Sequence, residues 1–108
     1  MVQAKAGVIS DFRKFMRKCG PSRSEAYLFG SRIRGDALAG SDLDAIIVSN
    51  DFQGTDFFKR MADMSKAWYD FFGPAIILEP LCYTRSEFAA KRNEIGIVSE
   101  ALKYAVKV

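Results

Sequence analysis

Apolar residues recur at helical spacing in two long segments of the chain. From Ala4 to Cys19 they alternate with lysine and arginine, and Gly20-Pro21 ends the pattern. From Phe57 to Phe72 charged residues flank an apolar stripe, which stops at Gly73-Pro74. The spacing predicts two amphipathic helices that each pack one face on a sheet. The stripe residues expected in the core are Phe57, Phe58, Met61, Met64, Trp68, Phe71 and Phe72.

Shorter apolar runs bounded by glycine and polar residues predict strands at 26–29, 43–48 and 75–83, with a short edge strand at 104–108. Further helices are expected after Gly30 as far as Leu38 and over residues 95–104. A capping-box pattern over 84–87 predicts that another helix begins directly after the third strand.

This order of elements predicts an α/β (α+β) fold, in which helices cover a small mixed sheet of three to four strands. With 108 residues, of which 49% are hydrophobic and 27% charged, the chain has the size and composition of a single folded domain, residues 1–108. No apolar run approaches the ~20 residues of a membrane span, and the N-terminus lacks the pattern of a signal peptide. We therefore expect a cytoplasmic protein without membrane partners.

Charge and composition limit which ligands the chain favours and which side chains can carry catalysis. The net charge of +3 favours anionic ligands. The absence of histidine leaves carboxylates, hydroxyls, lysine, arginine, tyrosine or a metal to carry any catalysis. The two cysteines, Cys19 and Cys82, lack the spacing of a zinc site or a disulfide framework, so we expect reduced structural thiols.

Two aspartates mark the start of the second predicted strand. Residues two apart on a strand share a face, so Asp42 and Asp44 are expected to project from the same side. Carboxylates held so close repel each other, whereas a divalent cation keeps both ionised. Magnesium fits best, because it takes few carboxylates and completes its shell with water and substrate phosphates.

A phosphate-binding turn is expected upstream. Gly30-Ser31 follows a predicted strand and opens a predicted helix, so its N–H groups and hydroxyl can meet a phosphate. Arg32 and Arg34 add positive charge, although both equally suit a solvated helix. Taken singly, the glycine-serine pair is most often a turn and Ser41-Asp42 a cap. Their combination with two strands at this spacing favours a phosphate-binding and metal-binding site.

Gly30-Ser31, Gly35 and Ser41-Asp42-Leu43-Asp44 resemble the GSxxxG…SDxD motif of the nucleotidyltransferase superfamily that contains DNA polymerase beta, in its minimal, single-domain, antitoxin-like branch. The resemblance implies a magnesium-dependent transfer of a nucleoside monophosphate, first of all AMP, from a nucleoside triphosphate to a hydroxyl acceptor. It also implies two magnesium ions held by the aspartates. The nucleotide-binding residues would be Gly30, Ser31, Arg32, Arg34 and Ser41.

The family's third carboxylate belongs to a strand beside the SDxD strand. Glu79 is the one acidic residue of the third predicted strand, and its expected burial among apolar residues would be explained by metal binding. The resemblance then makes Asp42, Asp44 and Glu79 the catalytic residues and metal ligands. Three departures stand out: Glu79 replaces the family's aspartate, Pro80 follows it, and Ile33 stands where a small residue is usual. The alternative is an edge-strand glutamate that reaches water.

The resemblance leaves a second function open. The resemblance implies that minimal members of the family are often encoded beside small helical proteins of the HEPN type. The chain could therefore be a non-catalytic antitoxin-like module that binds such a partner. Three neighbouring carboxylates favour the enzyme, because a scaffold does not require them. A length of 108 residues leaves no room for domains that hold a template duplex, so nucleic acid is expected only as an acceptor. A homo-oligomer stays open.

Overall fold

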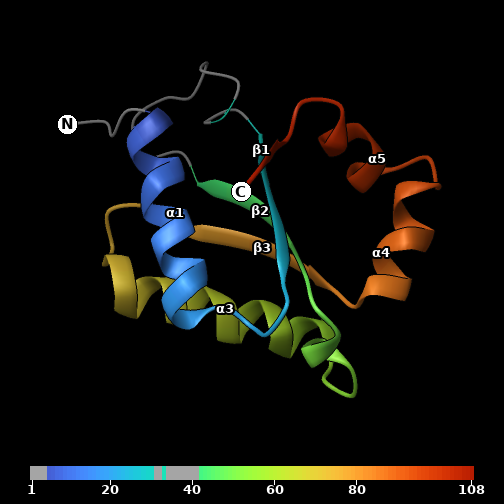
Figure 1. Cartoon of the computed structure of the whole chain (residues 1–108), viewed down its shortest axis with the longest axis horizontal. Coiled ribbons are helices and arrows are strands. Elements are labelled where there is room, and N and C mark those ends of the chain that lie inside the picture. The colour runs from blue at the N-terminus through green and yellow to red at the C-terminus, as the bar shows by residue number, and fades with distance from the viewer. Residues whose placement is uncertain (1–4, 31–32, 34–41) are drawn as a thin grey trace.

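In the computed structural model, residues 5–30, 33 and 42–108 are described, and Figure 1 shows their arrangement. The helices are α1 (Lys5–Cys19), the 3-10 helix η1 (Asn50–Phe52), α3 (Phe57–Phe72), α4 (Arg85–Arg92) and α5 (Ile97–Leu102). The strands are β1 (Glu25–Phe29), β2 (Leu43–Val48), β3 (Leu78–Tyr83) and β4 (Val106–Lys107). They form a four-stranded sheet in the order β3-β2-β1-β4. Because β1 is antiparallel to β2 and β4, while β2 is parallel to β3, the predicted small mixed sheet is confirmed.

Helices cover both faces of the sheet. Successive side chains of β2 point to opposite faces, so Ala45 and Ile47 join one core while Ile46 and Val48 join the other. The first core is the larger and contains the buried Trp68 of α3 together with the apolar face of α1. The second core lies under α4 and α5, and Figure 1 shows these two helices on the side of the sheet away from α1.

The third strand is shorter than its sequence predicts, because it begins at Leu78 instead of Ala75. Ala75 and Ile77 are exposed. The carbonyl of Ile76 accepts a hydrogen bond of 2.9 Å from the indole N–H of Trp68, so it takes no part in the sheet. The first three residues of the predicted strand therefore form a connection that closes the core over α3.

The stripe of α3 packs on the sheet as expected except at Phe58, whose exposed fraction is 75%. Neighbouring residues of a helix point about 100° apart, so Phe57 and Phe58 face different directions. Phe57 packs against Tyr83 of β3 with 5.5 Å between ring centroids, and Phe58 consequently faces solvent. The prediction that Phe58 belongs to the core is wrong.

The predicted capping box is present at the start of α4: the Thr84 hydroxyl accepts from the Glu87 N–H, and the Glu87 carboxylate accepts from the Thr84 N–H. The last predicted helix is shorter than residues 95–104, because α5 begins only after the cap at Gly96. The final strand is confirmed as an edge strand beside β1.

Most of the short helix expected after Gly30 lies outside the described residues. Within that stretch Ile33 is helical, and its N–H donates to the carbonyl of Gly30 over 3.1 Å. Its side chain is buried in the larger core. The large residue at this position is therefore accounted for by packing.

The two cysteines are free thiols, Cys19 exposed and Cys82 buried. Burial raises the pKa of the Cys82 thiol to about 12, which keeps it protonated and unreactive. None of the helices in the described part of the chain has the length and apolar character that crossing a bilayer requires.

A buried arginine, which the hydrophobic pattern does not reveal, ties α3 to β3 and α4. Arg60 is 7% exposed, and its guanidinium donates to the carbonyls of Thr55 and Cys82. It also donates to the Glu87 carboxylate over 2.7 Å. The same carboxylate caps α4, so the pKa of Glu87 lies below its usual range because of these hydrogen bonds, with Arg60 the largest cause. One side chain thus fixes the start of α4 on the sheet.

We expect Glu87→Ala to lower the free energy of unfolding by about 1–3 kcal/mol, because it removes the cap and leaves the buried charge of Arg60 without its carboxylate. Equilibrium unfolding in urea measures the change. The control is Glu94→Ala, which removes an exposed carboxylate 3.6 Å from Lys91 and should cost less than about 1 kcal/mol. Equal losses in the two variants would contradict the assigned role of Glu87.

Candidate active site

The register of the sheet places three described residues of the candidate site in one row. Asp44 pairs with Phe29 across the antiparallel strands and with Glu79 across the parallel strands. Partners directly opposite each other share a face. The three side chains therefore project toward the side of the sheet that carries α4 and α5. Asp42 precedes β2 directly and is half-buried.

Gly30 brings the end of β1 against the second aspartate of the motif. Its φ of 86° lies in the left-handed region that favours glycine. A Cβ at this position would overlap with Oδ2 of Asp44, so the backbone approaches the carboxylate more closely than any other residue permits. The turn expected to bind phosphate and the carboxylate expected to bind metal thus lie in direct contact.

The three carboxyl groups interact with one another. The pKa of Glu79 rises from its ordinary value of 4.5 to about 7, chiefly through a hydrogen bond with Asp42, then through partial loss of water around the carboxyl group and a hydrogen bond with Asp44. Burial also raises the pKa of Asp44, helped by the charge of Asp42. A hydrogen bond between two carboxyls requires a shared proton. Without a cation, Glu79 therefore keeps its proton to a higher pH than a free glutamate does.

The chemistry of these side chains suits a hard divalent cation, because carboxylate oxygens are the protein ligands that magnesium prefers. As placed in the described part of the chain, however, no three His, Cys, Asp or Glu side chains form a group that could hold a metal ion. The carboxyls bind one another instead. A cation would have to replace the shared proton, and Glu79 is the exposed member of the trio.

The expected burial of Glu79 is wrong. The burial of β3 alternates along the strand, and Glu79 falls on an exposed position between the buried Leu78 and Pro80. β3 is an edge strand of the sheet, so one side of it has no neighbouring strand. The apolar run around Glu79 is split between the two faces of the strand, which a one-dimensional sequence does not show.

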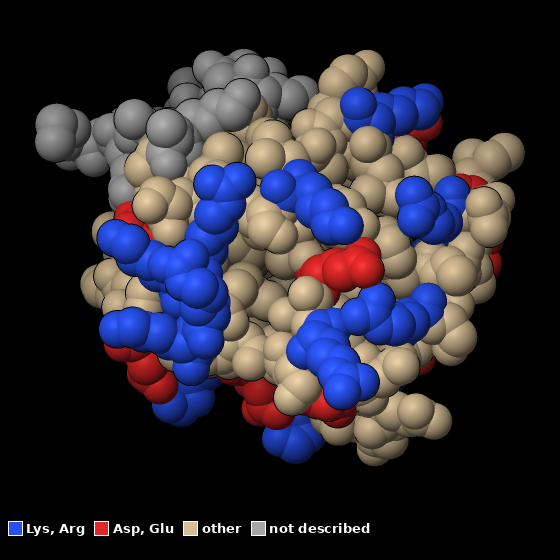
Figure 2. All heavy atoms as spheres, in the orientation of Figure 1, with Lys and Arg blue, Asp and Glu red and all other residues tan. Residues whose placement is uncertain are grey.

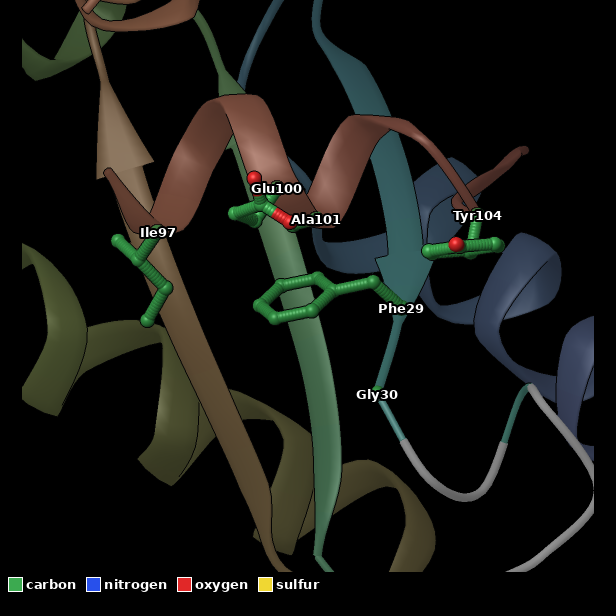
Figure 3. A pocket seen from close by; sticks show the side chains of 6 residues that line it. All are labelled: Phe29, Gly30, Ile97, Glu100, Ala101 and Tyr104. Carbon is green, nitrogen blue, oxygen red and sulfur yellow. The ribbon is translucent and has the colours of Figure 1, made fainter. Parts of the chain in front are cut away.

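Two hollows open beside the row of carboxyls, and both are bordered by Phe29 and Ile97. The larger has a volume of about 400 Å³ and reaches Asp44 and Glu79. It continues along the edge of the sheet past Met61 of α3. The smaller, of about 250 Å³, lies between Gly30 and α5 and is shown in Figure 3.

Sequence reasoning missed the residues that line these hollows. The described residues of the smaller one that it did not single out for the site are Phe29, Ile97, Glu100, Ala101 and Tyr104. The position of Phe29 directly before Gly30 is the one sequence signal that could have identified it. Three of the other four come from α5 and the fourth, Tyr104, directly follows it, about seventy residues further along the chain, so only the fold brings them to the turn.

Four expected nucleotide-binding residues, Ser31, Arg32, Arg34 and Ser41, lie outside the described residues, as does Gly35 of the motif. The structure thus describes Gly30, Asp42, Asp44 and Glu79 of the expected set, and it brings these four together. Their roles remain predictions.

The family of the chain follows from comparison with known proteins. The family model described as "Nucleotidyltransferase domain" matches residues 9–106. The chain therefore belongs to the nucleotidyltransferase domain family, as its resemblance to that superfamily predicts. A search among curated proteins finds no match.

A solved structure shares this fold. A crystal structure at 1.40 Å resolution, of a Sulfolobus solfataricus protein provisionally named a nucleotidyltransferase, superposes with a TM-score of 0.59 at 21% identity. The match covers 96% of this chain and 81% of that one. A second structure, also provisionally named a nucleotidyltransferase, is 27% identical over 80% of this chain and 88% of its own, with a TM-score of 0.49. The first likeness confirms the fold.

We expect Gly30→Ala to destabilise the protein by more than the roughly 1–2 kcal/mol that a left-handed backbone costs a residue with a Cβ, because Asp44 must also move. Gly54→Ala is the matched control, since Gly54 has φ 83° and no atom within 4 Å of the position of its Cβ. Unfolding in urea compares the two variants. If both lose the same stability, Gly30 does not approach Asp44 as closely as the structure describes.

The shared proton predicts an unusual pH dependence of stability in the presence of a chelator. A carboxyl whose pKa is about 7 in the folded state and 4.5 otherwise binds more protons when folded, so its stabilisation is complete below pH 4.5 and disappears as the pH rises through 7. Thermal unfolding should therefore show the melting temperature falling across this window. Glu25 and Glu87 have lowered pKa values, so they change the stability only at lower pH.

Glu79→Gln separates this effect from the rest of the protein. An amide can still donate to the aspartates but does not titrate, so the fall in melting temperature should flatten. A slope that is the same in the variant and the wild type would show that Glu79 does not hold the proton.

Proposed function

We propose that the protein is a magnesium-dependent nucleotidyltransferase that moves a nucleoside monophosphate from a nucleoside triphosphate to a hydroxyl acceptor. The monophosphate that we expect is AMP. The observation that carries the proposal is the contact of the Gly30 turn with Asp44, in the same row as Glu79. A phosphate-binding turn and a set of carboxylates serve this reaction only when they are adjacent. The family to which the chain belongs supports the transferase class.

In the proposed reaction the acceptor oxygen attacks the α-phosphorus in line, the bond to the bridging oxygen breaks, and pyrophosphate leaves. Glu79 is the exposed carboxyl of the row, so it is the group that an acceptor hydroxyl reaches first, and it takes the hydroxyl proton. Asp44 is half-buried against the Gly30 backbone, which holds its carboxylate beside the α-phosphate. The N–H groups of the turn would orient the outer phosphates.

Asp42, Asp44 and Glu79 would hold magnesium. Once bound, the metal would supply charge neutralisation on the phosphates and a lower pKa for the attacking hydroxyl. The protein's part is to bring its three carboxyl groups close together before any ligand binds: the sheet register places Asp44 opposite Glu79, and Asp42 directly precedes β2. The larger hollow, which reaches Asp44 and Glu79, leaves room for the acceptor.

Calorimetric titration of ATP, GTP, CTP and UTP, with magnesium and with a chelator, tests the proposal before the acceptor is known. We expect binding that requires magnesium in the wild type and is at least tenfold weaker in Asp44→Asn. The Asp44→Asn protein should be as stable as the wild type or slightly more so, because one repulsive charge is removed. Asp51→Asn, in η1 beyond the opposite end of β2, is the control and should bind normally. Equal binding in Asp44→Asn and the wild type would contradict the site.

A non-catalytic module that binds a HEPN-type helical partner is the second candidate function. The observation that favours it is the exposure of two aromatic side chains on α3, Phe58 at 75% and Tyr69 at 52%. Failure of every nucleotide to bind would favour this function. Retained affinity for a helical partner in Phe58→Ala and Tyr69→Ala would speak against these aromatics as its contact surface.

A further inference from the structure

The smaller hollow beside Gly30 is here called the α5 hollow. Its lining differs from that of the larger hollow, which includes the carboxyl groups of Asp44 and Glu79. Its described lining residues are Phe29, Gly30, Ile97, Glu100, Ala101 and Tyr104. Figure 3 shows the ring of Phe29 beneath α5, between Ile97 and Tyr104, with Gly30 next along the strand. We propose that the α5 hollow binds the base of the nucleotide and prefers a base that carries an exocyclic amino group. This inference rests on the proposed function.

Continuity with the carboxylates is the first argument. Gly30 lines the α5 hollow on one side, and its backbone touches the Asp44 carboxylate on the other. A nucleotide whose α-phosphate lies beside Asp44 has only its ribose between that phosphate and its base. The α5 hollow therefore begins about where the charged part of the ligand would end.

The size of the α5 hollow is the second argument. Pockets for drug-sized ligands measure about 300–1,000 Å³. At about 250 Å³, the α5 hollow is too small for a whole nucleotide and suits a single flat ring system. The larger hollow contains Asp44 and Glu79, so it is better suited to the reacting groups than to a base.

The exposed side chains of the α5 hollow are the third argument. Ile97 is 64% exposed and Tyr104 is 65% exposed, although both are large and line a concavity. A stacked base would cover apolar surface that now faces water. Stacking on an aromatic ring accepts any base, because every base has a π-face. These contacts would supply affinity, while discrimination between bases must come from a polar group.

Glu100 is that polar group. Its Oε1 accepts from the Lys103 ammonium over 3.0 Å, and the other carboxylate oxygen has further acceptor capacity. A carboxylate repels phosphates, which makes the α5 hollow unsuitable for the charged end of the ligand. It accepts hydrogen bonds from the amino groups that adenine, cytosine and guanine carry and that uracil lacks. The expected preference is therefore for ATP, CTP or GTP over UTP.

The first test compares ATP with inorganic tripolyphosphate, both with magnesium, on the full chain. Tripolyphosphate has the charge of the phosphate tail and no base. We expect Tyr104→Ala to raise the Kd of ATP roughly tenfold, as loss of base stacking does, and to leave the Kd of tripolyphosphate unchanged. The matched control is Tyr69→Ala, a similarly exposed tyrosine on α3, which should change neither Kd.

The second test measures the preference of the wild type and Glu100→Ala for ATP over UTP. We expect the Kd of UTP divided by the Kd of ATP to fall roughly threefold to tenfold in the variant, because the acceptor for the amino group is lost. Glu94→Ala is the control, since Glu94 is likewise an exposed carboxylate paired with a lysine three residues away, Lys91. It should leave the ratio unchanged.

The outcomes separate the two proposals. If the wild type binds neither ATP nor tripolyphosphate, the proposed function fails, and the base site fails with it. If tripolyphosphate binds and Tyr104→Ala leaves ATP binding unaltered, the phosphate site stands and the α5 hollow is not the base site. If Glu100→Ala leaves the ATP-to-UTP ratio unaltered, the preference for an amino-bearing base is overturned.

Discussion

The register of β2 between its two neighbours determines where Phe29, Asp44 and Glu79 of the candidate site lie. Asp44 is opposite Phe29 on one side and Glu79 on the other, so a shift of one residue would turn its carboxylate to the opposite face. The buried alternation of β2 opposes such a shift, because Ala45 and Ile47 would lose the larger core. The packing that stabilises the sheet therefore also fixes the position of the carboxylates.

The carboxylate row differs from the other charged groups that the structure describes. Glu87 pairs with Arg60, and Glu25 pairs with Arg85 at 3.0 Å, so each carboxylate lies beside a cation and has a lowered pKa. Glu79 instead interacts with two other carboxyls, and its pKa is raised. Carboxyl groups are brought together here and share a proton, and a cation that replaces this proton would allow all of them to ionise. This contrast is the physical basis of the proposed function.

Much of the fold could be predicted from periodicity, since α1, α3 and the first two strands begin and end within a residue or two of the pattern. The start of β3 could not, because the indole of Trp68 takes the carbonyl of Ile76. Nor could the burial of Arg60, which depends on partners far along the chain. For the site, the motif identified the aspartates, whereas the exposure of Glu79 and the lining from α5 arise only from tertiary packing.

The proposed function requires that Gly30, Asp44 and Glu79 lie around one metal-nucleotide site. Manganese added with ATP to isotopically labelled protein locates this site, because the paramagnetic ion broadens amide resonances only near its binding position. We expect the resonances of these residues to broaden first, and those of Arg85 and Asp51, in a separate hollow beyond the other end of β2, to stay sharp. Broadening centred on Asp51, or none that depends on ATP, would contradict the proposed site.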